Sequence, residues 1–343
     1  MRTHSRGKGS RRNTITLADV AREADVSQIT VSRVIRQLGP VSEETRQRVQ
    51  TVIKRIGYVP NRIAGALASA RSDLIGVIFP SVSNTVFADV LRGLHDALSD
   101  RGLRVVVTVT GYNLDTEEQH VRSLLALRPA AIVLTGCEHT EATTAMVSRA
   151  GISVVEIMDT DGTAIDLAVG LSHKHAAEAS ATYLLRRGYR RFGYVGHESR
   201  PRDLRAWRRW TSFLAMVKAA GAAVLGEEII AGPSSVPAGR AALKRLLTAN
   251  PDIHAVYFSN DDMAIGGLFH CLAEDLAIPE RLAIFGFNGL DIGQAMPKPL
   301  STILTFRYKI GLLAGKAILA RIDRAETARH TDVGFKLITG ATA

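Results

Sequence analysis

The chain has few of the features that mark secreted, cross-linked or membrane proteins. Its 343 residues include only two cysteines, Cys137 and Cys271, which lie too far apart to suggest a disulfide framework or a zinc-binding spacing. We expect both to be small buried hydrophobic residues. No apolar run is long enough to cross a bilayer, and no apolar stretch follows the basic N-terminal residues as in a secretory signal. These absences favour a cytoplasmic protein that has no membrane partner.

Signatures of catalysis and of metal binding are absent as well. The sequence contains no Gly-x-Ser-x-Gly elbow, Walker loop or dinucleotide fingerprint. His139, His173, His175 and His197 lack a third and a fourth ligand at a usable spacing, so we interpret them as solvated loop residues. An enzyme would need a catalytic pair in a cleft, and none can be assembled. We therefore expect no catalytic residue, no metal and no cofactor.

What the chain does have is a very uneven distribution of charge. Its formal net charge is +10, and residues 1–72 carry fourteen Lys and Arg against five Asp and Glu, which leaves 29 against 28 for the rest. Phosphate contacts and counterion release make nucleic acid the natural partner of so basic a segment, and a membrane surface is a distant second. The length suits a small basic domain joined to a larger one. We interpret residues 1–13 as a disordered basic arm.

Residues 14–58 have the pattern of three short helices. Thr16 and Asp19 resemble a capping box at the start of the first helix. Ser27 is a good N-cap for the second, Ser42 for the third, and Gly57 is a suitable C-terminal stop. The first two helices have the spacing of a helix-turn-helix, whose second helix enters the major groove of DNA. A small solvated helical bundle without a DNA role is the alternative.

The apolar face of the second helix fixes which side chains point outward. Once that face is buried, Gln28, Ile29 and Arg33 are left on the outside. Arg33 suits a bidentate contact to guanine, and Ile29 suits an apolar contact to a thymine methyl.

Three stretches resemble the lactose repressor family of bacterial transcription regulators: TLADVA (16–21), VSQITVSRV (26–34) and YVPNR (58–62). The likeness continues through nearly the whole chain. It implies DNA base contacts from Ser27, Gln28, Ile29 and Arg33, and DNA backbone contacts from Thr30, Ser32, Ser42, Thr45 and Asn61. The expected partner is therefore double-stranded operator DNA.

The resemblance also implies a hinge helix within residues 59–72. In the family this helix forms on operator DNA, pairs with its dimer mate in the minor groove, and inserts a leucine that kinks the duplex; here that residue is Leu67. The sequence agrees, because residues 61–68 are too few, and contain Gly65, to form a stable isolated helix in water. The alternative is an ordinary linker with Leu67 packed on the core. Since no heptad tail follows the core, we expect a homodimer rather than a tetramer.

From residue 74 onward, short apolar runs alternate with amphipathic stretches, which predicts parallel sheets with right-handed crossovers. The strand candidates form two sets: 74–79, 105–109, 131–134 and 154–158, then 192–195, 256–259, 283–287 and 303–305. Two sheets make two lobes that face a cleft. The resemblance implies the same arrangement, a periplasmic-binding-protein-like core over residues 73–343 with lobe crossings near 172, 303 and 333. The expected fold class is α/β with an N-terminal all-α helix-turn-helix domain.

Ligands of such open sheets bind outside the carboxyl ends of the strands, which here means in the cleft. Asp159, Asn260, Asp261 and Asn288 follow strand candidates, although Asp261 could equally cap the next helix. The resemblance adds Arg209, at the position of the family's sugar-binding arginine, and a wall from residues 81–87. The predicted effector-binding residues are Ser81, Asn84, Phe87, Asp159, Arg209, Asn260 and Asn288. We interpret the rest of the arginine run 200–209 as a solvated face.

Asn288 indicates the kind of effector. Relatives that bind neutral sugars commonly place an acid at this position, and a carboxylate there would repel an anionic ligand. Asn288 beside Arg209 therefore indicates a sugar acid, unless Asn288 merely satisfies loop backbone. The stretches VVEIMD (154–159), AVG (168–170) and DIGQ (291–294) resemble the gluconate repressors of the family. We expect a transcriptional repressor controlled by gluconate or a close hexonate.

Two alternatives remain open. Some relatives bind DNA more tightly with a corepressor, so the sign of the effector's action is not fixed. A two-lobed sugar-binding protein without a DNA role would need a signal peptide in place of residues 1–70.

Overall fold

The protein is described by a computed structural model, which covers residues 15–36, 38–59, 72–83, 85–197 and 203–343. The chain separates into two compact units, residues 1–70 and 71–343. Across the described residues, no helix is long and apolar enough to span a membrane.

The N-terminal unit contains three helices, α1 (Leu17–Glu23), α2 (Gln28–Arg36) and α3 (Glu43–Ile56). They enclose a small core of valines from all three, among them Val20, Val31 and Val49. Thr16 and Asp19 form the predicted capping box on α1. Ser42 caps α3, and Gly57 ends it with a positive φ of 69°, which glycine adopts without strain. The capping predictions for α1 and α3 are confirmed.

The second unit begins with a six-stranded parallel sheet, which we call the first lobe. Its strand order is β11-β5-β4-β3-β1-β2. The strands are β1 (Leu74–Phe79), β2 (Arg104–Val109), β3 (Ala131–Thr135), β4 (Ser153–Ile157), β5 (Leu167–Gly170) and β11 (His330–Asp332). The helices of this lobe are α5 (Thr85–Leu98), α6 (Leu114–Ala126), α7 (Glu141–Ala150) and α13 (Arg307–Ile322), with the short turn η1 (Ser99–Arg101) after α5.

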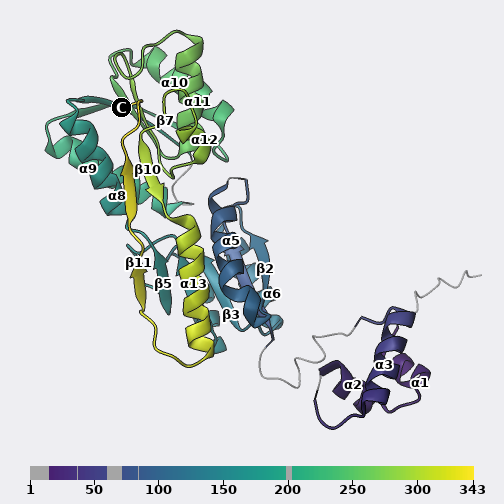
Figure 1. Cartoon of the computed structure of the whole chain (residues 1–343). Helices are drawn as coiled ribbons and strands as arrows, with labels where there is room; N and C mark the ends of the chain where they lie inside the picture. The colour runs from purple at the N-terminus through teal and green to yellow at the C-terminus, as the bar shows by residue number, and fades with distance from the viewer. Residues whose placement is uncertain (1–14, 37, 60–71, 84, 198–202) are drawn as a thin grey trace, which may run out of the picture. The chain divides into compact units, whose positions relative to one another are not determined.

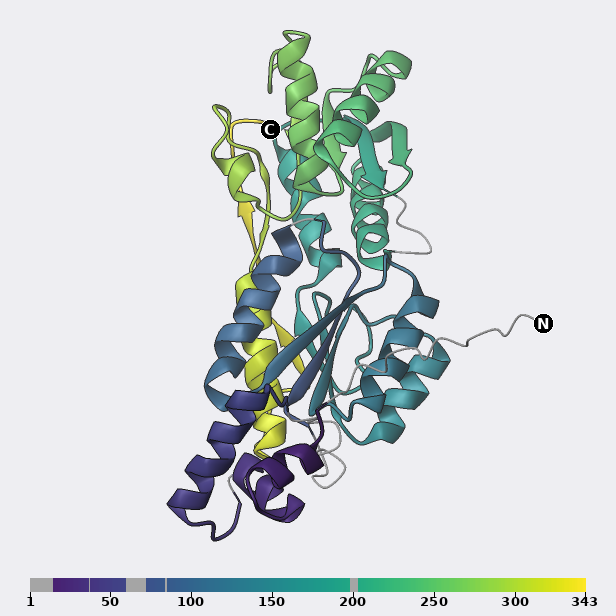
Figure 2. The same cartoon turned by 90° about the vertical axis from the view of Figure 1, so that its right-hand side faces the viewer.

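Two pairs of helices cover the two faces of this sheet. Residues of α6 and α7 share one apolar cluster with alternate strand residues such as Ile132. Residues of α5 and α13 pack in the main core with residues from the other face, such as Val133. Helices α5 and α13 lie side by side (Figures 1 and 2), and glycine allows it, because a Cβ on Gly93 would come within 2.1 Å of the Tyr308 carbonyl oxygen.

A four-stranded parallel sheet of order β7-β6-β8-β9 forms the second lobe. Its strands are β6 (Arg191–His197), β7 (Ala223–Ile230), β8 (Ala255–Phe258) and β9 (Ala283–Phe285). Its helices are α8 (His173–Arg186), α9 (Leu204–Ala219), α10 (Val236–Ala249), α11 (Asp261–Ala273) and α12 (Asp291–Gln294). A separate antiparallel pair, β10 (Thr302–Thr305) and β12 (Phe335–Ile338), runs between the lobes.

The chain crosses between the lobes three times: from β5 to α8, from β10 to α13, and from β11 to β12. These crossings lie at residues 170–173, 305–307 and 332–335, close to the expected 172, 303 and 333. All eight strand candidates are strands within two residues at each end. The expectation that 303–305 belongs to the second parallel sheet was wrong, because this segment is β10 of the antiparallel pair. The predicted fold class is confirmed, and the two-sheet arrangement makes the cleft between lobes the natural place for a small ligand.

Candidate functional site

Helix α2 presents an exposed face that contains three of the four predicted base-contacting residues, and the fourth, Ser27, is exposed directly before the helix. Gln28, Ile29 and Arg33 are exposed, while Val31 and Val34 on the opposite side are buried in the core. Ile29 is 66% exposed, so its apolar side chain is available to a partner and adds nothing to the core. The prediction that these side chains point outward is confirmed.

Hydroxyl groups mark the start of both α2 and α3. Ser27 Oγ accepts a hydrogen bond from the Thr30 backbone N–H at 3.1 Å, and Ser42 Oγ accepts one from Thr45 N–H at 3.3 Å. These four predicted contact residues therefore lie at helix N-termini, where backbone N–H groups and the helix dipole favour a phosphate. Ser32 is half-buried one turn further along α2. The predicted backbone contact Asn61 and the predicted wedge Leu67 lie outside the described residues.

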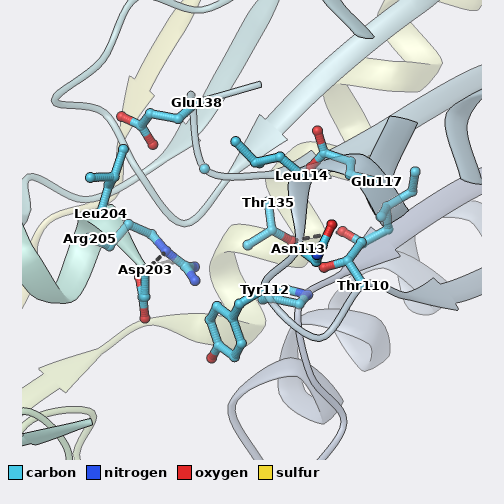
Figure 3. Close-up of a pocket in the computed structure, with 13 residues that line it drawn as sticks. Thr110, Tyr112, Asn113, Leu114, Glu117, Thr135, Glu138, Asp203, Leu204 and Arg205 are labelled. Atoms are coloured by element: carbon cyan, nitrogen blue, oxygen red, sulfur yellow. Dashed lines mark hydrogen bonds and ion pairs between the residues drawn. The ribbon is translucent and has the colours of Figure 1, made fainter. Parts of the chain in front are cut away.

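A cavity opens between the two lobes where β1, β2 and β3 end and α9 begins (Figure 3). The first lobe contributes polar residues to its wall, and the second contributes the first turn of α9. The polar lining residues are Thr110, Tyr112, Asn113, Glu117, Thr135, Glu138, Asp203 and Arg205. The cavity lies beyond strand ends, as the strand-end rule expects of a ligand site, but none of the predicted effector-binding residues is among the residues that line it.

Arg209 lies buried in the second lobe behind this cavity. Its Nη1 donates to Nδ1 of His173 at 3.0 Å, its Nη2 donates to the Ser259 carbonyl at 3.1 Å, and its guanidinium carbon lies 4.0 Å from the centre of the Phe287 ring. Burial and the nearby arginines hold the pKa of His173 well below its ordinary value. A neutral His173 that accepts at Nδ1 carries its proton on Nε2, which donates to the Met158 carbonyl at 2.7 Å.

Asp203 and Arg205 form a second charged group at the start of α9. Asp203 caps the helix by accepting from Ala206 N–H at 3.3 Å and holds Nε of Arg205 at 3.3 Å. His197 Nε2 lies 3.7 Å from the other carboxylate oxygen of Asp203. Burial alone would raise the pKa of Asp203, but Arg205 and His197 outweigh it and hold that pKa well below its ordinary value. Asp203 is therefore ionised at neutral pH.

Asp159 follows β4 as predicted, but its carboxylate is already bonded to protein. Oδ2 accepts from Arg208 Nη1 at 2.5 Å, and Oδ1 accepts from Asp161 N–H at 2.8 Å. Arg208 also pairs with Glu138, so this α9 residue joins the second lobe to two loops of the first. Burial raises the pKa of Asp159 to about 6.

The backbone of Asn288 is held in an unusual conformation. Its φ is 120°, a region that side-chain-bearing residues seldom adopt and that Asn tolerates better than most. Asn288 N–H donates to the Ile303 carbonyl at 2.9 Å, and its own carbonyl accepts from Thr305 and from the guanidinium of Arg307. Arg307 Nε reaches Asp89 on α5 at 3.1 Å, so the loop that carries Asn288 is bonded to the first lobe.

The remaining predicted effector residues have structural contacts of their own. Asn260 caps α11, since its Oδ1 accepts from Met263 N–H at 3.2 Å. Ser81 Oγ accepts from Ser83 N–H at 3.0 Å, and the buried Phe87 ring lies 5.0 Å from that of Phe79. Asn84 lies outside the described residues.

The suggestion that Asp261 caps α11 was wrong, because Asn260 is the cap. Asp261 is fully buried, and its carboxylate accepts from Leu290 N–H and from Thr302 Oγ1, both at 2.7 Å. It therefore joins the loop after β9 to β10. Burial raises the pKa of Asp261 to about 6.

Two further interpretations need correction. His173 and His197 are buried, and the His139 side chain is 1% exposed between Glu117 and Glu156, so only His175 is the solvated residue that we expected. The physical reason is that carboxylate, carbonyl and guanidinium partners stabilise these histidines in buried positions. Among the described residues, no group of three His, Cys, Asp or Glu side chains is arranged to hold a metal ion.

The arginine run is likewise not a simple solvated face, because Arg205 is as buried as Arg209. Arg205 lies four residues before Arg209, which places both on one side of a helix, and this spacing was the signal that we missed. Of the two cysteines, Cys271 is buried as expected and Cys137 is half-buried.

Comparison with known proteins gives two family matches. Residues 72–338 match the periplasmic binding proteins and sugar binding domain of the LacI family, and residues 16–61 match the bacterial regulatory proteins of the lacI family. The chain is 38% identical over 325 residues to the HTH-type transcriptional regulator GntR of Pseudomonas aeruginosa, with 94% of each chain covered. It is 33% identical over 334 residues to the HTH-type transcriptional regulator IdnR of Escherichia coli, covering 97% of this chain and 99% of that one.

A solved structure is also closely similar. A crystal structure of a LacI-family transcriptional regulator from Silicibacter pomeroyi superposes with a TM-score of 0.91 at 41% identity, covering 96% of this chain and 99% of that one.

Proposed function

Because the chain belongs to the LacI family of bacterial regulatory proteins, we propose that a gluconate-like sugar acid controls the affinity of the protein for operator DNA. The protein is a DNA-binding transcriptional repressor with a sugar-binding core. Its named relatives are transcription regulators and not enzymes. Because a repressor acts where the chromosome is, we also propose that it works in the cytoplasm.

The DNA-binding part of the proposal concerns a homodimer on a pseudopalindromic operator. Each N-terminal unit sets α2 into one major-groove half-site, with Gln28, Ile29 and Arg33 at the base edges and the start of α3 on phosphates. Leu67 wedges a central base step in the minor groove. The exposed face of α2 supports this, and so does the charge of residues 1–72, which is fourteen minus five, or +9.

One observation supports an anionic effector above all. Arg209 is 7% exposed, yet among the described residues no carboxylate forms an ion pair with it, and its partners are the neutral His173 and a backbone carbonyl. A buried cation with no described carboxylate bonded to it, and with only the charge of Asp203 to balance it and Arg205, favours a ligand that brings a negative charge. The uncharged Asn288 nearby adds no repulsion. The names GntR and IdnR of two relatives agree with a hexonate such as gluconate or idonate.

The sign of the effect depends on which arrangement of the lobes binds DNA more tightly. An effector that contacts both walls of the cleft favours one relative arrangement of the lobes, and it changes operator affinity only to the extent that it binds the two arrangements unequally. We propose that the closed arrangement separates the paired hinges and releases DNA, so gluconate acts as an inducer. If the effector were a corepressor, closure of the lobes would instead raise the affinity for operator DNA.

The proposal is tested with the full-length protein. Calorimetry against gluconate, idonate, glucose and ribose measures effector choice, and fluorescence anisotropy of an operator duplex with and without gluconate measures the sign. We expect gluconate to bind and to weaken operator binding. Binding of neutral sugars alone would contradict the effector proposal, and tighter operator binding with gluconate would make it a corepressor.

A further inference from the structure

We propose that Arg205, and not Arg209, binds the carboxylate of the effector directly, an inference that rests on the proposed sugar-acid effector. Sequence resemblance identified Arg209 as the ligand arginine, and the lining of the cavity points to its neighbour one helical turn earlier. The two arginines differ in which guanidinium nitrogens remain available.

Arg209 has no available donor that faces the cavity. Its two terminal nitrogens are used by His173 and by the Ser259 carbonyl, and its guanidinium lies against the Phe287 ring. Its Nε is fully buried and has no hydrogen-bond partner among the described residues. The residue does not line the cavity. Arg209 therefore contributes positive charge and a rigid wall from behind the cavity, and one N–H of each terminal nitrogen is already used by a protein partner.

Arg205 has the opposite arrangement. Only its Nε has a hydrogen-bond partner among the described residues, the carboxylate of Asp203 at 3.3 Å, and the residue lines the cavity. Figure 3 shows its guanidinium pointing into the cavity, with Asp203 on one side and Tyr112 below. The two terminal nitrogens form the end of a planar fork, the geometry that binds a carboxylate with two parallel hydrogen bonds. Because the residue lines the cavity, a ligand that enters the cavity can reach them.

Asp203 fixes the direction of this fork without neutralising the site. Its carboxylate also caps α9 and lies within 3.7 Å of His197, so its charge is shared among three partners. With Arg209 close behind, the second-lobe wall has two arginines against one aspartate. A side chain held by its Nε loses little freedom when the ligand binds, and this preorganisation favours affinity.

The opposite wall suits the rest of a hexonate. Thr110 of the first lobe offers its hydroxyl to the same cavity, Asn113 its amide NH2 and Thr135 its hydroxyl oxygen, since the Asn113 oxygen caps α6 and the Thr135 hydroxyl donates to the Ile78 carbonyl. The two glutamates on this wall are paired, Glu117 with His139 and Glu138 with Arg208. Burial, followed by the charge of Asp203, raises the pKa of Tyr112 to about 12, so its phenol stays protonated and can both donate and accept. The effector would thus lie across the cleft with its carboxylate at the second lobe and its hydroxyl groups at the first. This orientation makes Arg205 the residue that separates sugar acids from polyols of the same length.

The experiment compares gluconate with glucitol, which has the same carbon chain but no carboxylate, by calorimetry on full-length protein. The variants are Arg205→Met, Arg205→Lys and, as a matched control, Arg245→Met, an exposed arginine that pairs with Glu228 outside the cavity. Loss of charge-assisted hydrogen bonds should weaken gluconate binding roughly 10- to 100-fold in Arg205→Met. The lysine variant should lose less because it keeps the charge but not the fork. The Arg245→Met variant should bind gluconate as tightly as wild type, and glucitol affinity should be the same in every variant. Thermal unfolding shows which variants are folded.

The outcomes separate the inference from the function on which it rests. If wild type binds gluconate and both Arg205 variants bind it equally well, Arg205 is not the anchor, and the sugar-acid effector stands. If wild type binds no sugar acid, the effector proposal fails and the inference fails with it. If Arg205→Met does not fold, the folded Arg205→Lys variant must still show a smaller ratio of gluconate to glucitol affinity than wild type, and an unchanged ratio overturns the inference.

Discussion

Replacing Arg307 by methionine should weaken both the core and its effector site. Arg307 is 7% exposed at the start of α13, where its guanidinium donates to the Asn288 carbonyl and, at 3.2 Å, to Thr305 Oγ1. The hydrogen bond from a charged donor to the Asn288 carbonyl contributes about 1.5–3 kcal/mol. The partly exposed ion pair with Asp89 adds about 0–1 kcal/mol, and Asp89 keeps a second partner in Arg92 at 3.1 Å. We expect the free energy of unfolding to fall by roughly 2–4 kcal/mol.

The same substitution loosens the conformation of Asn288. Strain at such a backbone position costs on the order of 1–3 kcal/mol and persists only while neighbours hold it. Without Arg307 the loop can relax. Part of the free energy of gluconate binding is then used to return the loop to its strained conformation, so the affinity for gluconate should fall roughly tenfold. Urea unfolding followed by circular dichroism measures the first effect and calorimetry the second. Lys316→Met, an exposed change on the same helix, is the control. Changes below about 0.5 kcal/mol in stability and twofold in affinity would refute this role for Arg307.

Three other perturbations give distinct results. Leu67→Ala should weaken binding to the cognate operator much more than to random duplex, and equal losses on both, measured by anisotropy, would refute the wedge. Asn288→Asp should weaken gluconate binding at least tenfold through like-charge repulsion while sparing neutral sugars, and calorimetry that finds gluconate unaffected would remove Asn288 from the effector site. Burial would lower the pKa of His139, but its hydrogen bonds to two glutamates outweigh burial and raise that pKa to about 9, so the folded state binds the proton more tightly than the unfolded state. This stabilisation, about 3 kcal/mol, should be fully present below pH 6.5 and disappear as the pH rises through 9, and urea unfolding of His139→Gln should lack that slope.

The fold was predictable wherever burial alone dictates the sequence. Strands such as β1 and β3 are nearly continuous apolar runs because helices cover both faces of the sheet. Four strands were not predicted. β11 is the polar triplet His-Thr-Asp at a sheet edge, and β7 contains Glu227 and Glu228 on a partly exposed edge. β5 and β12 were missed too, and their length does not explain it, since β8, β9 and β10 are no longer than they are. Their pairing partners come from distant parts of the chain, which local periodicity does not encode.

The sequence pointed to the carboxyl ends of the strands, where a cavity lies, but not to the residues that line the cavity or to their bonds. The rule that ligands lie beyond strand ends identified the neighbourhood of Asp159, Asn260 and Asn288. No sequence pattern indicated that Arg208 would occupy the Asp159 carboxylate, or that Asp261 would join two segments of the second lobe. These bonds depend on which side chains meet across the lobes. The spacing of Arg205 from Arg209 was available, and it would have suggested a second buried arginine.

The bonds between the lobes bear directly on how an effector can act. Arg208 joins α9 to Glu138 and Asp159, and His173 donates to the Met158 carbonyl, so the second lobe holds the first through two neighbouring groups of contacts. An effector that only filled the cleft would bind any arrangement of these lobes equally and would shift nothing. One whose carboxylate binds α9 and whose hydroxyl groups bind the loops after β2 and β3 gains affinity only when both walls are within reach. That difference in affinity is the free energy available to change operator binding.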